Sequence, residues 1–274
     1  MKTLLTGLGF GESPRWHGGR LWFCNWGTGE IVSVSPQGES RVETVVPVKI
    51  PYCIDWLPDG RLLVVLGPEG VLSRLEPDGT LATHAKLGPG MFNEIVLDRH
   101  GNIYVNGGGF DGPGNILVVT PEGAVREVAT GIEFGNGMVV TPGSATLIVA
   151  ESWGNRLSAF DIGSDGSLSG RRVWAELGDA APDGICLDDS GAVWYADVPH
   201  RSCVRVREGG EVLERVELDR GGFACALGGN TLYVLAAEFH GFETVEADLA
   251  ARTGILAAVE VSVPGAIGGS LSGS

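Results

Sequence analysis

The sequence predicts an all-β fold, a six-bladed β-propeller of four-stranded antiparallel blades around a central metal-binding channel. The first observation is a recurring β-hairpin, in which two short apolar strands flank a turn. The second is its period, since successive hairpins open 40, 41, 43, 47 and 40 residues apart. Strand repeats of ~40 to 50 residues are typical of propellers. The third is the length, because six such repeats use all 274 residues. Residues 1–274 are therefore expected to form one domain.

The six hairpins can be aligned with one another on the second strand of each. They cover residues 12–25, 52–67, 92–107, 135–152, 181–198 and, in a weaker copy, 223–238. Each is followed by an outer hairpin, as at 31–34 with 39–46, 71–75 with 81–85, and 115–119 with 125–129. The turns in these three read x-Pro-x-Gly, which suits turn positions that need a fixed or a positive φ.

The two ends and two insertions complete the chain. Residues 1–10 are too few for a blade, so a strand containing Leu4 and Leu5 is expected to join the last blade beside 255–263 and leave no open edge. The insertions at 107–115 and 238–254 either cover a mouth of the channel or lie on the surface.

Composition limits the partners and the compartment. With 19 basic and 34 acidic residues the net charge is −15, which disfavours nucleic acid and anionic membranes and favours cations and small molecules. The five cysteines lie mostly among apolar strand residues without a CxxC motif, as free thiols in a reducing compartment do. No signal peptide or membrane span is apparent. We expect a cytoplasmic protein, either a monomer or a small homo-oligomer.

The residues that open the six hairpins are the candidate functional ring. First strands line a propeller's axis, so these positions face one another: Glu12, Tyr52, Asn93, Asn136, Asp183 and Phe223. Two carboxylates and two amides in a narrow channel repel one another and lose solvation, which a divalent cation relieves. All-oxygen donors favour Ca²⁺, with Mg²⁺, Mn²⁺ or Zn²⁺ as alternatives; the ring's lack of His and Cys argues against a dedicated zinc site. The alternative is that these side chains bond turn backbones, as Asn-Gly and Asp-Gly pairs often do.

As a set, the motifs resemble one family across the whole chain. GESPRW at 11–16, FNE at 92–94, FGNGM at 134–138, AESWGNRLSAFD at 150–161 and PDGICLDDSGAVWYAD at 182–197 are similar to the senescence-marker-protein (regucalcin) and gluconolactonase family of six-bladed propellers. The resemblance implies one divalent metal on Glu12, Asn136 and Asp183, with Asn93 at the metal or the substrate. It also implies lactone hydrolysis, with Asp183 as a base.

One departure bears on the substrate. Relatives that bind sugar lactones often carry Arg two residues before the Asn that matches Asn93, and this chain has Met91. Losing a guanidinium removes contacts to hydroxyls, so a less polar lactone or ester is expected.

Other residues were assigned from their positions along the chain. Glu94 is a second candidate base. The expected substrate contacts are Asn93, Met91, Tyr52, Phe223, Trp153, His200 and Phe110. No nucleophile elbow, HExxH or phosphate-binding Gly motif is present. The alternatives to a lactonase are a non-catalytic calcium-binding or ligand-binding propeller and a phosphotriesterase on the same scaffold.

Overall fold

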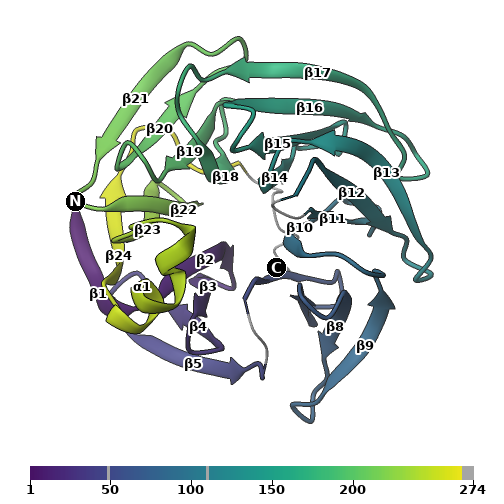
Figure 1. Ribbon diagram of the computed structural model, residues 1–274, viewed down its shortest axis with the longest axis horizontal. Coiled ribbons are helices and arrows are strands. Elements are labelled where there is room, and N and C mark those ends of the chain that lie inside the picture. The colour runs from purple at the N-terminus through teal and green to yellow at the C-terminus, as the bar shows by residue number, and fades with distance from the viewer. Residues whose placement is uncertain (48–49, 109–110, 267–274) are drawn as a thin grey trace.

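The computed structural model describes residues 1–47, 50–108 and 111–266, and these form six four-stranded antiparallel sheets arranged in a ring (Figure 1). Blades 1 to 3 consist of β2 (Phe10–His17), β3 (Arg20–Trp26), β4 (Glu30–Val34), β5 (Ser40–Val45); β6 (Tyr52–Trp56), β7 (Leu62–Leu66), β8 (Val71–Leu75), β9 (Leu81–Lys86); and β10 (Phe92–Leu97), β11 (Ile103–Gly107), β12 (Gly114–Val119), β13 (Val125–Ile132).

The remaining blades repeat this order. They consist of β14 (Gly135–Val140), β15 (Thr146–Glu151), β16 (Arg156–Ile162), β17 (Leu168–Glu176); β18 (Pro182–Leu187), β19 (Val193–Asp197), β20 (Ser202–Val206), β21 (Val212–Glu217); and β22 (Gly221–Gly228), β23 (Thr231–Ala237), β24 (Gly254–Glu260), β1 (Lys2–Leu8). The predicted six-bladed propeller is confirmed.

The ring is closed by the two ends of the chain. Strand β1 pairs antiparallel with β24, for example Lys2 with Ala258 and Thr6 with Ile255, so blade 6 contains both the first and the last strand of the chain (Figure 1). This confirms the expected clasp. Without it, β24 would present unpaired backbone groups at a sheet edge.

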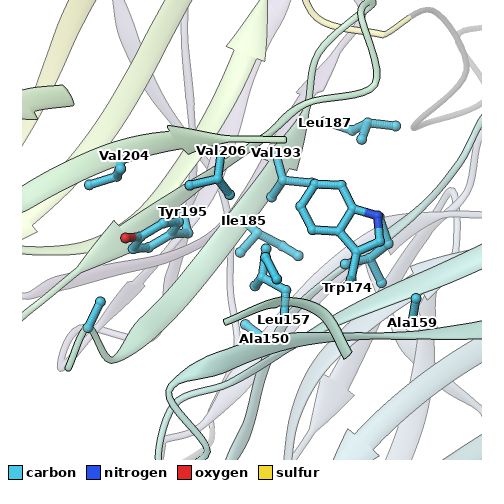
Figure 2. Close-up of a cluster of buried hydrophobic side chains, with 13 residues drawn as sticks. Ala150, Leu157, Ala159, Trp174, Ile185, Leu187, Val193, Tyr195, Val204 and Val206 are labelled. Atoms are coloured by element: carbon cyan, nitrogen blue, oxygen red, sulfur yellow. The ribbon is translucent and has the colours of Figure 1, made fainter. Parts of the chain in front are cut away.

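The cores lie between adjacent blades. At the interface of blades 4 and 5, Leu157, Ala159 and Trp174 pack against Ile185, Val193 and Val206 (Figure 2). Side chains of a strand alternate between its two faces, so each sheet buries apolar residues toward both neighbouring blades. This packing fixes the blades, and with them the inner strands β2, β6, β10, β14, β18 and β22 that surround the axis (Figure 1).

One excursion leaves this pattern. Between β23 and β24 the chain forms a 3₁₀ turn, η1 (Phe242–Thr244), and one short helix, α1 (Val245–Ala251). Val245 and Leu249 pack against the cluster of Phe10 and Phe223, so the excursion lies over the inner ends of blades 6 and 1. None of the helices in the described part of the chain has the length and apolar character needed to cross a bilayer.

Candidate functional site

The inner strands of five blades carry an irregularity where the candidate ring residues lie. In blade 3 the pairing passes from Phe92 with Gly107 to Glu94 with Asn106, which leaves Asn93 without a partner. Equivalent shifts lie between Gly135 and Met138, Pro182 and Ile185, and Gly222 and Ala224. In blade 1 the shift lies between Glu12 and Arg15, and Glu12 itself still pairs with Cys24. A bulge of this kind turns a side chain out of the regular alternation. The bulges therefore bring Asn93, Asn136, Asp183 and Phe223 to one cavity, which Glu12 also lines.

Blade 2 lacks this irregularity, and its ring residue is placed differently. The pairing of β6 with β7 is unbroken from Tyr52–Leu66 to Trp56–Leu62. The Tyr52 ring is fully buried, and its hydroxyl donates a hydrogen bond of 2.7 Å to the carbonyl oxygen of Asn25 in blade 1. Tyr52 therefore does not line the cavity, because regular pairing directs it into the interface between blades 1 and 2.

Glu12, Asn93, Asn136 and Asp183 form one polar end of a cavity of about 770 Å³. Glu12 is buried, whereas Asn93, Asn136 and Asp183 are half-buried and face the open space. Volumes of ~300 to 1,000 Å³ are typical of small-molecule sites. The site therefore has room for a ligand beside the acids and amides.

The two carboxyl groups of the ring are in an unfavourable environment for negative charge. Burial raises the pKa of Glu12 well above its ordinary value, and repulsion from Asp183 and Glu94 raises it further. Burial also raises the pKa of Asp183, with a second contribution from Glu94. The Oδ1 atom of Asp183 is buried and has no hydrogen-bond partner among the described residues. Such an oxygen is rare in a folded protein and marks a place for a cation or a proton donor.

The amides of the ring bond to each other and to their support. Asn93 Nδ2 donates to Asn136 Oδ1 at 2.8 Å, and Asn136 Nδ2 donates to Ser152 Oγ at 3.4 Å. Ser152 Oγ in turn donates to the Pro182 carbonyl oxygen at 2.7 Å, which ties blade 4 to the residue before Asp183. An amide oxygen has two lone pairs, so Asn136 Oδ1 retains an acceptor site while bonded to Asn93.

A buried charge network lies next to the ring. Arg15 Nη2 donates to Glu94 Oε1 at 2.8 Å, and its Nε lies 3.9 Å from Asp55 Oδ2. Glu94 Oε1 also accepts bonds from Ser13 Oγ and from the Ile95 amide. Because Glu94 does not line the cavity and is engaged by Arg15, its expected role as a base is not supported by its position. Arg15 is not among the predicted site residues, although it lies three residues after Glu12 within the same GESPRW motif.

The rest of the wall is largely apolar. Of the expected substrate contacts, Met91, Asn93, Trp153 and Phe223 line the cavity, and Phe110 lies outside the described residues. The lining also includes aromatic residues that sequence reasoning missed: Phe10, Trp26, Phe134, Phe239 and Phe242. Phe10 and Phe134 each stand two residues before a ring residue, which is the one signal that pointed to them. The insertion 238–254 does cover the cavity, through Glu238, Phe239, Phe242 and Val245.

His200 was expected in the same wall, but it faces elsewhere. Its Nδ1 lies 2.9 Å from Oδ2 of the buried Asp197, and it lines a separate cavity of about 310 Å³. Its neighbours Val198, Pro199 and Arg201 line the main cavity instead. His200 therefore lies outside the main cavity, because the carboxylate of Asp197 holds the imidazole on the other side.

Glycines next to the ring allow adjacent inner strands to approach closely. A Cβ atom added to Gly137 would lie 2.5 Å from the Ile185 nitrogen and 2.8 Å from the Asp183 carbonyl oxygen. A Cβ on Gly184 would lie 2.6 Å from the Cβ of Ala224. The Asn-Gly and Asp-Gly pairs at 136–137 and 183–184 therefore lie where two inner strands pack closely.

Substitution of Gly137 by alanine is expected to lower the free energy of unfolding by about 1–3 kcal/mol, since the added methyl group forces the inner strands of blades 4 and 5 apart. Urea unfolding followed by tryptophan fluorescence measures this. Gly112→Ala is the matched control, because a Cβ there meets nothing within 4 Å, and we expect a change of at most about 0.5 kcal/mol. Equal effects of the two substitutions would contradict the close approach.

The donor set limits the metals that fit. Within the described ranges, no group of three or more His, Cys, Asp and Glu side chains is arranged to hold a metal ion. The ring offers two carboxylates and two amide oxygens, which is the chemistry of a hard cation rather than of a thiolate or imidazole site.

Comparisons with known proteins agree with this architecture. A family model described as the SMP-30/gluconolactonase/LRE-like region matches residues 10–238. The 6-deoxy-6-sulfogluconolactonase of Pseudomonas putida is 26% identical over 93% of this chain and 92% of its own length. Among solved structures, a luciferin-regenerating enzyme superposes with a TM-score of 0.84 at 19% identity, covering 98% of this chain and 97% of the other. The calcium-binding protein regucalcin from Agrobacterium tumefaciens gives 0.81 at 22% identity, covering 97% and 95%. The matched region spans both carboxylates and both amides of the ring, and the chain belongs to the SMP-30/gluconolactonase/LRE-like family.

Proposed function

We propose that this protein hydrolyses lactones and that a divalent cation, most favourably Ca²⁺, is held by Glu12, Asn136 and Asp183 with Asn93 beside it. The observation that carries the proposal is a buried carboxylate, Glu12, beside the half-buried Asp183, whose Oδ1 is buried and unpartnered among the described residues, at the polar end of a ligand-sized cavity. Membership of a gluconolactonase-containing family and the likeness to a sulfogluconolactonase support the reaction class.

The residues present fit such a cation. Burial and mutual repulsion destabilise the charged forms of Glu12 and Asp183, and a positive charge between them removes both penalties. Asp183 Oδ1 and the second lone pair of Asn136 Oδ1 supply oxygen donors without breaking an existing bond. Mn²⁺, Mg²⁺ and Zn²⁺ are the alternatives that the experiments below distinguish.

The chemistry divides between the ion and the chain. When bound, the ion polarises the lactone carbonyl and lowers the pKa of water. The other carboxylate oxygen of Asp183, Oδ2, accepts the proton of the water that adds to the carbonyl carbon. The second N–H of Asn136 Nδ2 orients the lactone by a hydrogen bond, while Asn93 Nδ2 holds the Asn136 amide in place. The ring C–O bond breaks and the proton passes to the departing oxygen, so that one lactone and one water give one hydroxy acid. Aromatic side chains exclude other water from the cavity.

An ion with only a structural role is less consistent with this geometry. Purely structural sites are closed by protein ligands, whereas catalytic sites keep open positions. Three of the four ring ligands are half-buried and face the cavity. This exposure favours an enzyme over a non-catalytic calcium-binding propeller.

The test is an assay of γ- and δ-lactones, aryl esters and an aryl phosphotriester in the presence of Ca²⁺, Mn²⁺, Mg²⁺, Zn²⁺ or a chelator. We expect lactone hydrolysis that chelation abolishes and one cation restores best. Metal-dependent cleavage of the phosphotriester alone would replace the lactonase by a phosphotriesterase. Absence of all turnover, with the ion still bound, would instead favour the non-catalytic propeller.

Cation binding is also expected to stabilise the fold. At a Ca²⁺ concentration about one hundred times its Kd, the free energy of unfolding rises by about 2.7 kcal/mol, which raises the Tm by roughly 5–10 °C for a domain of this size. Differential scanning calorimetry with Ca²⁺ and with chelator measures the shift. Glu12→Gln should remove most of it, whereas Glu208→Gln, on the exposed rim, should leave it intact. A full shift in Glu12→Gln would exclude Glu12 as a ligand.

We also propose a cytoplasmic location. All five cysteines are free, and four of them are buried. Free thiols of this kind persist in a reducing compartment.

A further inference from the structure

Exposed large apolar side chains gather at the mouth of the main cavity. Met91 is 39% exposed, Trp153 47% and Phe242 54%, and all three line the cavity. They come from three separate segments: the residue before β10, the residues after β15, and η1. Exposed apolar side chains that converge at a concave site mark a binding surface.

These side chains belong to a continuous aromatic wall. The rings of Phe134 and Trp153 stack at 4.5 Å, and Phe134 meets Phe242 edge-on at 5.9 Å. The Phe242 ring in turn lies 5.4 Å, centroid to centroid, from the Phe239 ring, and the Phe239 ring lies 5.9 Å from that of Phe223. The wall therefore runs from blade 4 across η1 to blade 6, where Phe223 also belongs to the ring next to the carboxylates.

The part of the wall on the excursion is held in place. Asp248 of α1 accepts hydrogen bonds from the His240 amide at 2.9 Å and from Thr244 Oγ1 at 3.0 Å, and its Oδ1 lies 2.7 Å from His240 Nδ1. These bonds close the segment on itself at both sides of Phe242. The aromatic surface is thus organised before a ligand arrives, which reduces the entropy lost on binding.

The same cavity offers few partners for hydroxyl groups. In the described part of the chain, the polar end of the cavity consists of Glu12, Asn93, Asn136, Asp183 and Ser152. The other charged side chains of the lining are Arg201 and Glu238, and Arg201 Nη2 lies 3.4 Å from Glu238 Oε2. A polyhydroxylated ligand loses water from each hydroxyl and needs a replacement bond for it. An apolar group loses nothing there and gains contact area.

We propose that the substrate of this site is an uncharged lactone that carries an apolar substituent, either an aryl ring or an alkyl chain. The lactone carbonyl lies at the ring of acids and amides, and the substituent lies on the wall formed by Phe134, Trp153, Phe239 and Phe242. This inference rests on the proposed lactonase function and specifies its substrate class.

A series of δ-lactones tests the inference. We compare kcat/KM for δ-valerolactone, δ-nonalactone, dihydrocoumarin and glucono-δ-lactone, each divided by the rate constant for hydroxide-catalysed hydrolysis of the same compound. Each added carbon on the wall is expected to raise the normalised value about fourfold, so δ-nonalactone, with four more carbons, exceeds δ-valerolactone about 250-fold. Comparison of dihydrocoumarin with δ-nonalactone shows whether the site prefers an aryl or an alkyl substituent. A normalised value for glucono-δ-lactone equal to or above that for δ-nonalactone overturns the inference.

Variants locate the effect on the wall. In Phe242→Ala and in Trp153→Ala, the ratio of kcat/KM for dihydrocoumarin to that for δ-valerolactone is expected to fall about tenfold. Val173→Ala is the matched control, because Val173 is 48% exposed on β17 and does not line the cavity. An unchanged ratio in both wall variants contradicts the placement of the substituent.

Binding of uncleavable lactams separates this inference from the proposed function. Isothermal titration compares the lactam analogue of dihydrocoumarin with δ-valerolactam, and we expect at least tenfold tighter binding of the former. If no lactone is hydrolysed but this preference holds, the lactonase proposal fails and the apolar site stands. If lactones are hydrolysed but the two lactams bind equally, the function stands and the substrate class is wrong.

Discussion

Replacing Asp183 by asparagine is expected to lower kcat/KM for lactone hydrolysis about a thousandfold, and to raise the Tm of the metal-free protein. The loss follows because one carboxylate supplies both an ion ligand, Oδ1, and the proton acceptor, Oδ2, and positioned acid–base groups contribute ~10² to 10⁴ in rate. The gain in stability follows because burial and repulsion from Glu94 disfavour the charged carboxylate, and an amide carries no charge. Steady-state kinetics and calorimetry with chelator measure the two effects.

Asp179→Asn provides the matched control for this substitution. Its carboxylate is 95% exposed at the edge of the second cavity, so activity is expected to stay within about twofold. The opposite signs of the two Asp183 effects distinguish lost chemistry from lost folding. Full metal-dependent turnover in Asp183→Asn would refute the roles assigned to this residue.

Replacing Arg15 by methionine is expected to lower the free energy of unfolding by about 3–5 kcal/mol. Glu94 is 7% exposed and Asp55 2% exposed, and Arg15 is the cation that both contact. Breaking a buried pair leaves uncompensated charge, which accounts for this magnitude. At roughly 2–4 °C per kcal/mol, the Tm should fall by roughly 10 °C. Arg172→Met is the control, because its pair with Asp161 is largely exposed and contributes at most about 1 kcal/mol.

The defect of Arg15→Met is expected to diminish as the pH falls. Burial raises the pKa of Asp55 to about 6 in the native protein, although Arg15 lowers it. A carboxyl group whose pKa is higher in the folded than in the unfolded state stabilises the fold fully at pH values below its unfolded pKa. This stabilisation is lost as the pH rises through the folded-state pKa. Without Arg15 the pKa of Asp55 rises further, so the variant should regain stability relative to the wild type between pH 7 and pH 5. Urea unfolding at both pH values measures this, and a pH-independent difference would argue against Asp55 as the cause.

Much of the fold is predictable from local pattern. Hairpins such as 92–107 and 182–197 show alternating apolar residues and turn chemistry within one stretch of chain, and the repeat period then indicates the ring. The clasp between β1 and β24 follows because a closed ring removes an open edge. Phe239 and Phe242 could not be assigned in this way, since their place in the site depends on the course of an insertion without a repeat.

The orientation of individual side chains required the tertiary structure. Regular strand pairing places the Tyr52 ring between two blades, although sequence alignment sets it equivalent to Asn93. Likewise Asp197 holds the His200 imidazole away from the cavity, and Arg15 forms an ion pair with Glu94. The contacts of Tyr52 and Arg15 join residues of different blades, so no local sequence signal contains them. Asp197 and His200 are only three residues apart, but the direction of the imidazole depends on how the turn between them is folded.

The sequence by itself determined that this chain forms a six-bladed ring with acids and amides at equivalent positions of its inner strands, because that information is repeated locally in each blade. Only the tertiary structure decided which of those side chains meet at one cavity and which walls surround it. The physical reason is that a one-residue bulge reverses the face to which a strand side chain points, and the bulge exists only in the pairing of two strands.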